Sequence, residues 1–220
     1  MDQGTSKPEL EGVRDSAPGT YAEHDGVSAT DTAAFAPRCI SIDLEVGRDD
    51  ARIHRFAAVR GDTGESFHFR GGDLNAGLAK LDRLADGVAF VVGHNLIDFD
   101  AKYLAASDSD LRLLHLPQVD TLRLNPLAFP RNPYHHLVKH YQDGQLKHGS
   151  RNDPELDARL TLGVLRDQHQ AFRAMSDSAP ELVLAYHWLT TVDGKSSGLD
   201  IFFATVRHRP RPSSAKAAEA

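Results

Sequence analysis

The sequence predicts an α/β fold in which a mixed central sheet, an antiparallel meander of three strands followed by parallel strands, is flanked by helices. Two observations favour this fold. Apolar and polar residues alternate with a period of two over residues 38–46, as they do in a strand, and two further strand-like segments follow. Helical spacing then alternates with a short, wholly apolar run that is typical of a buried strand. With 220 residues, the chain is long enough for one sizeable domain with a buried core.

The first half of the domain holds the meander. Alternation predicts a strand over residues 38–46. Residues 53–60 and 65–69 are expected to form two further strands, and Gly61–Asp62–Thr63–Gly64 is suited to a hairpin turn between them. Leucines at helical spacing predict a helix over residues 74–84, and residues 89–93 form the short apolar strand.

Helices dominate the second half. They are expected over residues 99–106, 134–141, 154–175 and 180–189, and residues 199–206 form a short apolar element. Residues 1–37 have almost no spaced large apolar side chains and are expected to be a disordered leader. A proline-containing tail over residues 207–220 is interpreted in the same way, which leaves residues 38–206 as the domain.

Composition narrows the class of protein. No run of about 18 apolar residues occurs, so no membrane span is expected. The amino-terminal residues lack a basic start followed by an apolar run, and Cys39 is the one cysteine, so a reducing cytoplasm is the simplest location. The net charge of −6 argues against a general nucleic-acid coat, unless several carboxylates bind cations.

Asp43 and Glu45 are the first unusual feature. They lie two residues apart in a predicted buried strand, so both side chains leave the same face. Two like charges on one face are costly unless a cation lies between them. An edge strand with a solvated polar face would also accommodate the pair.

The second feature is the segment Gly93–His94–Asn95–Leu96–Ile97–Asp98–Phe99–Asp100. An apolar strand ends at a glycine, and polar groups follow where a helix begins, which is where open sheets place their sites. Asp98 is expected to cap that helix, and Asp100 would then point elsewhere. Both acids would equally be favoured by the positive end of the helix alone.

The third feature is Asn152–Asp153–Pro154–Glu155–Leu156–Asp157–Ala158. Asn152 or Asp153 is expected to cap a helix that Pro154 begins. Asp157 lies one turn in, beside the small Ala158, which permits close approach to another element. Taken alone, the segment is explained as a helix start.

Together, Asp43-x-Glu45, the His-Asn…Phe-Asp segment and the late Asp-Ala on a helix resemble the four-acid (DEDD) 3′–5′ exonuclease superfamily, which has a ribonuclease-H-like fold. Val119–Asp120–Thr121–Leu122 is similar to the Asp-Thr-Leu segment of these proteins. Further details, including Tyr134–His135–His136–Leu137, are similar to exonuclease-like domains at the amino terminus of bacterial RecQ-type DNA helicase proteins.

The resemblance implies two Mg²⁺ or Mn²⁺ ions, because ligand sets made only of oxygen select hard cations. Asp43, Glu45 and Asp157 would share one ion, Asp43 would bridge to the second, and Asp100 would hold the second partly through water. These four acids would be the catalytic and metal-binding residues of a nuclease acting on phosphodiester bonds. Asn95 and Asp120 are expected to hydrogen-bond to these ligands and orient them, or, for Asp120, to accept from a nearby backbone N–H.

The sequence departs from the family where a His or Tyr usually assists the attacking water. Asn152 and Asp153 occupy those positions, and Asn152 can orient a water but cannot accept its proton. Asp153 or a mobile His148 would have to act as the base, or the metal would do most of the work. Otherwise the domain would be slow or inactive.

A local concentration of His, Lys, Arg and Tyr side chains lies between Tyr134 and Arg151 and would suit single-stranded nucleic acid. A solvated helix face would carry the same residues. The residues expected to contact nucleic acid are His94, Tyr134, His136 and Lys139. No recognised zinc spacing is present, and Gly194–Lys195–Ser196 is only a fragment of a phosphate-binding loop.

These observations predict a cytoplasmic, metal-dependent 3′–5′ exonuclease that acts on DNA or RNA, with single-stranded 3′ ends as its substrate and a helicase or repair protein as a possible partner. The alternative is a catalytically weak or inactive exonuclease-like module that binds nucleic acid or assists a helicase. The intact acids favour the enzyme, and Asn152 favours the accessory module.

Overall fold

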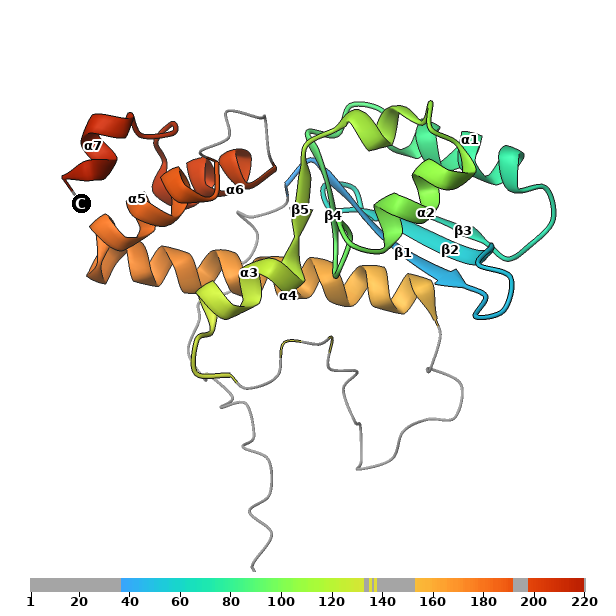
Figure 1. Ribbon diagram of the computed structural model, residues 1–220, viewed down its shortest axis with the longest axis horizontal. Helices are drawn as coiled ribbons and strands as arrows, with labels where there is room; N and C mark the ends of the chain where they lie inside the picture. The colour runs from blue at the N-terminus through green and yellow to red at the C-terminus, as the bar shows by residue number, and fades with distance from the viewer. Residues whose placement is uncertain (1–36, 133–134, 136, 138–152, 192–197, 220) are drawn as a thin grey trace, which may run out of the picture. The chain divides into compact units, whose positions relative to one another are not determined.

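The computed structural model describes residues 37–132, 135, 137, 153–191 and 198–219 (Figure 1). All of them belong to one compact unit, Phe35–Ala220. The predicted leader over residues 1–37 lies outside the described residues except for Pro37. The predicted helix over residues 134–141 also lies outside them, except for His135 and Leu137.

A five-stranded mixed sheet forms the centre of this unit. The strands are β1 (Cys39–Val46), β2 (Ile53–Arg60), β3 (Ser66–Phe69), β4 (Phe90–Gly93) and β5 (Gln118–Asp120). Their order across the sheet is β3-β2-β1-β4-β5. The first three form an antiparallel meander, and β4 and β5 continue the sheet parallel to β1. The predicted α/β class and the predicted meander are confirmed.

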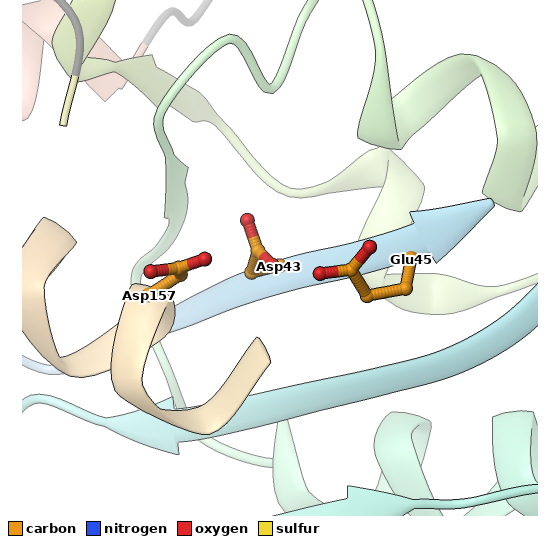
Figure 2. Close-up of side chains that lie close together, drawn as sticks. All are labelled: Asp43, Glu45 and Asp157. Atoms are coloured by element: carbon orange, nitrogen blue, oxygen red, sulfur yellow. The ribbon is translucent and has the colours of Figure 1, made fainter. Parts of the chain in front are cut away.

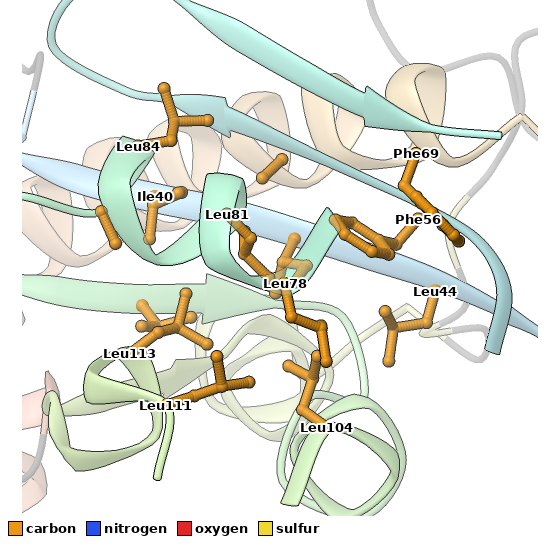
Figure 3. Packing of buried hydrophobic residues seen from close by; sticks show 14 of the residues in the cluster. Ile40, Leu44, Phe56, Phe69, Leu78, Leu81, Leu84, Leu104, Leu111 and Leu113 are labelled. Carbon is orange, nitrogen blue, oxygen red and sulfur yellow. The ribbon is translucent and has the colours of Figure 1, made fainter. Parts of the chain in front are cut away.

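The alternation along β1 divides the core into two clusters on opposite faces of the sheet. Ile40, Ile42 and Leu44 pack on one face against α1 (Leu74–Leu84) and α2 (Asp100–Ser107). Figure 3 shows Ile40 and Leu44 in this cluster beside Leu78 and Leu104. Cys39 belongs to the cluster on the other face, which includes side chains of α4 (Pro154–Ser178). Asp43 and Glu45 share the face of Cys39, because they follow it at intervals of two residues.

The long helix α4 packs across β1 and β2. In Figure 1 it is the orange helix that runs along the sheet. Its start follows the prediction: Pro154 is in the first turn, and the Asp153 carboxylate accepts hydrogen bonds from the backbone N–H groups of Glu155 and Leu156. The remaining helices are the 3₁₀ helix η1 (Arg112–His115), α3 (Thr121–Ala128), α5 (Pro180–Leu189), α6 (Gly198–Arg207) and α7 (Ser214–Ala218).

The strand β5 and the helices η1 and α3 have no counterpart among the predicted elements. A strand of three residues is too short for a period-two pattern, and Pro126 lies inside α3, where proline normally indicates a helix end. Beyond α6, where the sequence predicts a disordered tail, the structure places α7, with Ser213 as its cap. Arg211 just before it donates from Nε to the hydroxyl of Thr191.

Within the described part of the chain, no helix combines the length and the apolar character needed to cross a membrane.

Candidate metal centre

Strand β1 presents Asp43 and Glu45 toward the helix α4. The intervening Leu44 is only 5% exposed and lies in the core of the opposite face, so the alternation of the strand is maintained through the acids. Both acids are half-buried, and β1 is a central strand, paired with β2 on one side and β4 on the other. The interpretation of β1 as an edge strand is therefore wrong, although its pairing with β4 covers only Cys39 to Ser41 and ends before Asp43.

Asp157 reaches the same place from α4. Ala158, the next residue, is fully buried and has no side chain beyond Cβ to hold the helix away from the sheet. One carboxylate oxygen from each of Asp43, Glu45 and Asp157 lies within 4.8 Å of the other two. Figure 2 shows the three side chains converging, two from the strand and one from the helix.

Three carboxylates at this separation repel one another if all are ionised, because the pairwise energy of like charges rises as the local dielectric falls. A cation between them removes the repulsion. Oxygen-only ligand sets suit hard divalent ions such as Mg²⁺ and Mn²⁺. The set formed by Asp43, Glu45 and Asp157 can therefore hold a metal ion.

Asp100 lies beside this set and is not a member of it. It is 3% exposed, and its Oδ1 accepts a hydrogen bond of 3.1 Å from the backbone N–H of Leu44, the residue between Asp43 and Glu45. The pKa of the Asp100 carboxyl is raised to about 8, chiefly by burial and also by the charge of Asp120, while the Leu44 hydrogen bond acts in the opposite direction. The structure thus joins three of the four predicted acids and attaches the fourth to the same strand.

Asp120 organises the loop that leads to Asp100. Its carboxylate accepts from the backbone N–H groups of Asn95, Ile97 and Leu122, at 3.0, 3.1 and 3.0 Å. The same side chain therefore caps α3 and holds the loop after β4. Asn95 adopts a positive φ of 75°, which asparagine tolerates better than most residues. The expected role of Asp120 as a partner for nearby backbone N–H groups matches this geometry.

His94 is held by the end of the sheet. The hydroxyl of Thr121 donates to the carbonyl of Gly93 at 3.1 Å, so its oxygen is left to accept from Nδ1 of His94 at 2.9 Å. The other ring nitrogen, Nε2, is buried. Nδ1 of His94 is therefore directed toward Thr121, and the expected contact of His94 with nucleic acid stays a prediction.

Asp98 does not cap α2, and that prediction is wrong. The residue at the cap position is Phe99, which offers no side-chain hydrogen bond. The exposed Asp98 carboxylate pairs instead with Arg123 at 2.7 Å and with Lys102 at 3.4 Å, and both cations lower the pKa of Asp98. Two cations in the neighbouring turns compete successfully with the backbone N–H groups for an exposed carboxylate.

Several residues expected to assist the attacking water or to contact nucleic acid are not among those that the structure describes. Asn152 lies outside the described residues, as do His148, Tyr134, His136 and Lys139. The Asp153 carboxylate is used to cap α4, where its Oδ1 already accepts two backbone N–H groups.

A contact without a local signal in the sequence attaches the start of α4 to the edge strand β3. Glu155 Oε1 accepts from the hydroxyl of Ser66 and from Arg159, and its Oε2 lies 3.4 Å from Nδ1 of His68. The partners are 89 and 87 residues apart in the chain, so only the folded structure brings them together.

Cys39 is buried, as expected of a core residue. Burial raises the pKa of its thiol to about 12, so the nucleophilic thiolate is scarce at neutral pH.

Comparison of the chain with protein-family models found no matching family, and comparison with curated proteins found no matching relative.

Proposed function

We propose that this chain is a metal-dependent 3′–5′ exonuclease with a ribonuclease-H-like fold, which hydrolyses phosphodiester bonds at the 3′ end of DNA or RNA. The strand order β3-β2-β1-β4-β5, with the acids on the central β1, supports the fold assignment. The observation that carries the proposal is the convergence of Asp43, Glu45 and Asp157, with ligand oxygens within 4.8 Å of one another.

Phosphodiester hydrolysis suits an acidic cluster that binds cations. Attack by water adds negative charge to a phosphate that is already anionic, and a pair of divalent ions about 4 Å apart, when bound, activates the water and stabilises the leaving oxygen. The role of Asp43, Glu45 and Asp157 is to hold these cations at one place on the sheet. Their carriers are a central strand and a capped helix, so the site is built on rigid elements.

Asp100 is assigned to the second ion by the sequence resemblance. Its attachment to Leu44 keeps its carboxyl beside the strand that carries Asp43 and Glu45. Because its pKa is about 8, Asp100 holds a proton at neutral pH until a nearby cation favours the charged form. Proton release from Asp100 is therefore expected to accompany uptake of the second ion.

The second candidate function is a catalytically weak or inactive module that binds nucleic acid or assists a helicase. The observation that favours it is the engagement of Asp153 as the cap of α4, because its Oδ1 already accepts two backbone N–H groups in a structural role. With Asn152 as its neighbour, the base would have to come from elsewhere.

A degradation assay on single-stranded DNA labelled at its 3′ end separates the two. Wild type, Asp43→Ala and Asn152→His are compared in Mg²⁺ and in Mn²⁺, with the exposed Asp177→Asn at the far end of α4 as the matched control. Cleavage in wild type and in Asp177→Asn that is lost in Asp43→Ala is the result expected of the enzyme. Binding without cleavage in both metals would contradict the enzyme and favour the accessory module. Faster cleavage by Asn152→His would show that the missing base limits the rate.

A further inference from the structure

Arg55 on β2 lies directly across the sheet from Glu45. The two residues are partners in the antiparallel register of β1 and β2. Direct partners share a face, and their Cβ atoms are about 4.5–5.5 Å apart. Arg55 therefore emerges on the face that carries Asp43, Glu45 and Asp157, at the margin of the candidate metal centre.

The neighbours of Arg55 on the same face leave it at a boundary between core and solvent. Ala57, two residues further along β2 and opposite Asp43, is fully buried, whereas Arg55 is exposed. The register of β1 and β2 changes immediately beyond this pair, between Glu45 and Val46. Such bulges reorient side chains and are frequent beside active sites.

The guanidinium of Arg55 makes no hydrogen bond or ion pair within the part of the chain that the structure describes. The acids around it have other partners: Glu155 pairs with Arg159 and His68, and Asp50 pairs with His54. Glu45 belongs to the set that converges with Asp43 and Asp157. Within the described residues, Arg55 is thus a cation that does not neutralise a neighbouring carboxylate.

The hairpin that carries Arg55 is closed and well defined. Gly47 donates from its backbone N–H to the carbonyl of Arg52, and Ala51 donates to the carbonyl of Gly47. A Cβ on Gly47 would lie 2.8 Å from Nε2 of His54, so a larger residue there would displace the exposed Asp50–His54 pair from this turn. The backbone of Arg55 therefore belongs to a paired strand beside a hydrogen-bonded turn, which fixes where its side chain leaves the sheet.

We propose that Arg55 binds a phosphate of the nucleic-acid strand whose scissile bond occupies the centre formed by Asp43, Glu45 and Asp157. This inference rests on the proposed function and adds a positioning residue to it. A guanidinium presents parallel N–H donors that match two phosphate oxygens, and it keeps its charge at any relevant pH. Cations held by the acids and a guanidinium beside them would together complement a phosphodiester backbone.

The test measures binding separately from cleavage. The affinity of a fluorescein-labelled single-stranded oligodeoxynucleotide is measured by anisotropy in Ca²⁺ at several salt concentrations, for wild type, Arg55→Gln, Arg55→Lys and Arg83→Gln. Arg83 is the matched control because it is exposed on α1, which packs on the opposite face of the sheet. Arg55→Gln is expected to bind about tenfold more weakly, with a salt dependence reduced by about 0.7 in the slope of log K against log salt, the change for one phosphate contact on a single strand. Arg55→Lys should keep the slope of wild type, and Arg83→Gln should match wild type in both quantities.

Unchanged affinity and unchanged salt slope in Arg55→Gln would overturn the inference. Calorimetric uptake of Mn²⁺ and cleavage in Mn²⁺, measured on the same proteins, keep this result distinct from the proposed function. If the protein takes up metal and cleaves, but the salt slope of Arg55→Gln is unaltered, only the proposed phosphate contact of Arg55 is contradicted. If wild type takes up no Mn²⁺ and does not cleave, but its binding depends on Arg55, the proposed nuclease function is contradicted and the phosphate contact is supported.

Discussion

Asp100 accepts, through Oδ1, a hydrogen bond of 3.1 Å from the backbone N–H of Leu44, which lies 56 residues earlier in the chain. The parallel pairing of β1 with β4 covers Cys39 to Ser41 only, so the edge of β1 beyond it needs another partner. The first residue of α2 supplies it. This single contact ties the helix start to the point of the strand between Asp43 and Glu45.

Asp100 should make the stability of the metal-free protein depend on pH. Its carboxyl keeps a proton in the folded state up to a pKa of about 8, but loses it near 3.8 when unfolded, so the free energy of unfolding should fall as the pH rises between these values. In Asp100→Asn, which keeps an oxygen for Leu44 and carries no charge, this fall should be much smaller. Denaturant titrations in EDTA at several pH values measure it. Identical pH profiles for the two proteins would contradict a buried, proton-holding Asp100.

Asp157→Asn should separate metal binding from stability. Removing one of three converging charges should raise the melting temperature in EDTA, and should reduce the further rise that Mn²⁺ produces in wild type, because a ligand that binds only the folded state stabilises it. Thermal melts with and without Mn²⁺ check both effects. Asp177→Asn, exposed on the same helix, is the control and should behave as wild type. A full Mn²⁺ response in Asp157→Asn would remove Asp157 from the set of ligands.

Asp120→Ala should destabilise the protein by about 2–3 kcal/mol, because backbone N–H groups that donate to its carboxylate would lose their partner. Asp120 is 3% exposed and accepts three backbone N–H groups from two segments. Asp73, an exposed helix cap with two such contacts, provides the comparison, and Asp73→Ala should cost only about 1 kcal/mol. Equal losses in urea titrations of the two variants would show that the loop after β4 does not depend on Asp120.

His169 should weaken the fold in acid. Burial lowers the pKa of its imidazole to about 4, from 6.5 when unfolded, and the charges of Arg173 and His208 act in the same direction. A group with a lowered pKa that is neutral when folded contributes stability above 6.5 that is lost as the pH falls toward 4. His169→Phe, which keeps a ring against Phe202, should therefore lose less stability over this range. His187, whose pKa is also lowered by burial, remains in both proteins, so a residual acid dependence is expected in the variant.

Local sequence was sufficient for the elements with strong periodicity. Strand β2 and the helices α1 and α5 have the boundaries that their patterns predict, and the cap at Asp153 and Pro154 sets the start of α4. In each case the signal is contained in neighbouring residues, as alternation, helical spacing or a capping side chain. The shared face of Asp43 and Glu45 follows from the same alternation.

Local sequence was insufficient where structure depends on distant partners. Strand β5 exists because Val91 to Gly93 pair with it, and the preference of Asp98 for Arg123 over the end of its own helix depends on a turn 25 residues away. The resemblance suggested that four acids belong together, but their local patterns could not place Asp157 against β1 or Asp100 against Leu44.

The sequence by itself determined the α/β class, the meander and the acids that share a face of β1, because periodicity and capping act over a few residues. Only the tertiary structure decided that Asp157 joins Asp43 and Glu45 while Asp100 holds the strand beside them. Packing of α4 across the sheet places Asp157, and the edge of β1 that β4 leaves uncovered binds Asp100. Both depend on burial and hydrogen bonding between segments far apart in the chain.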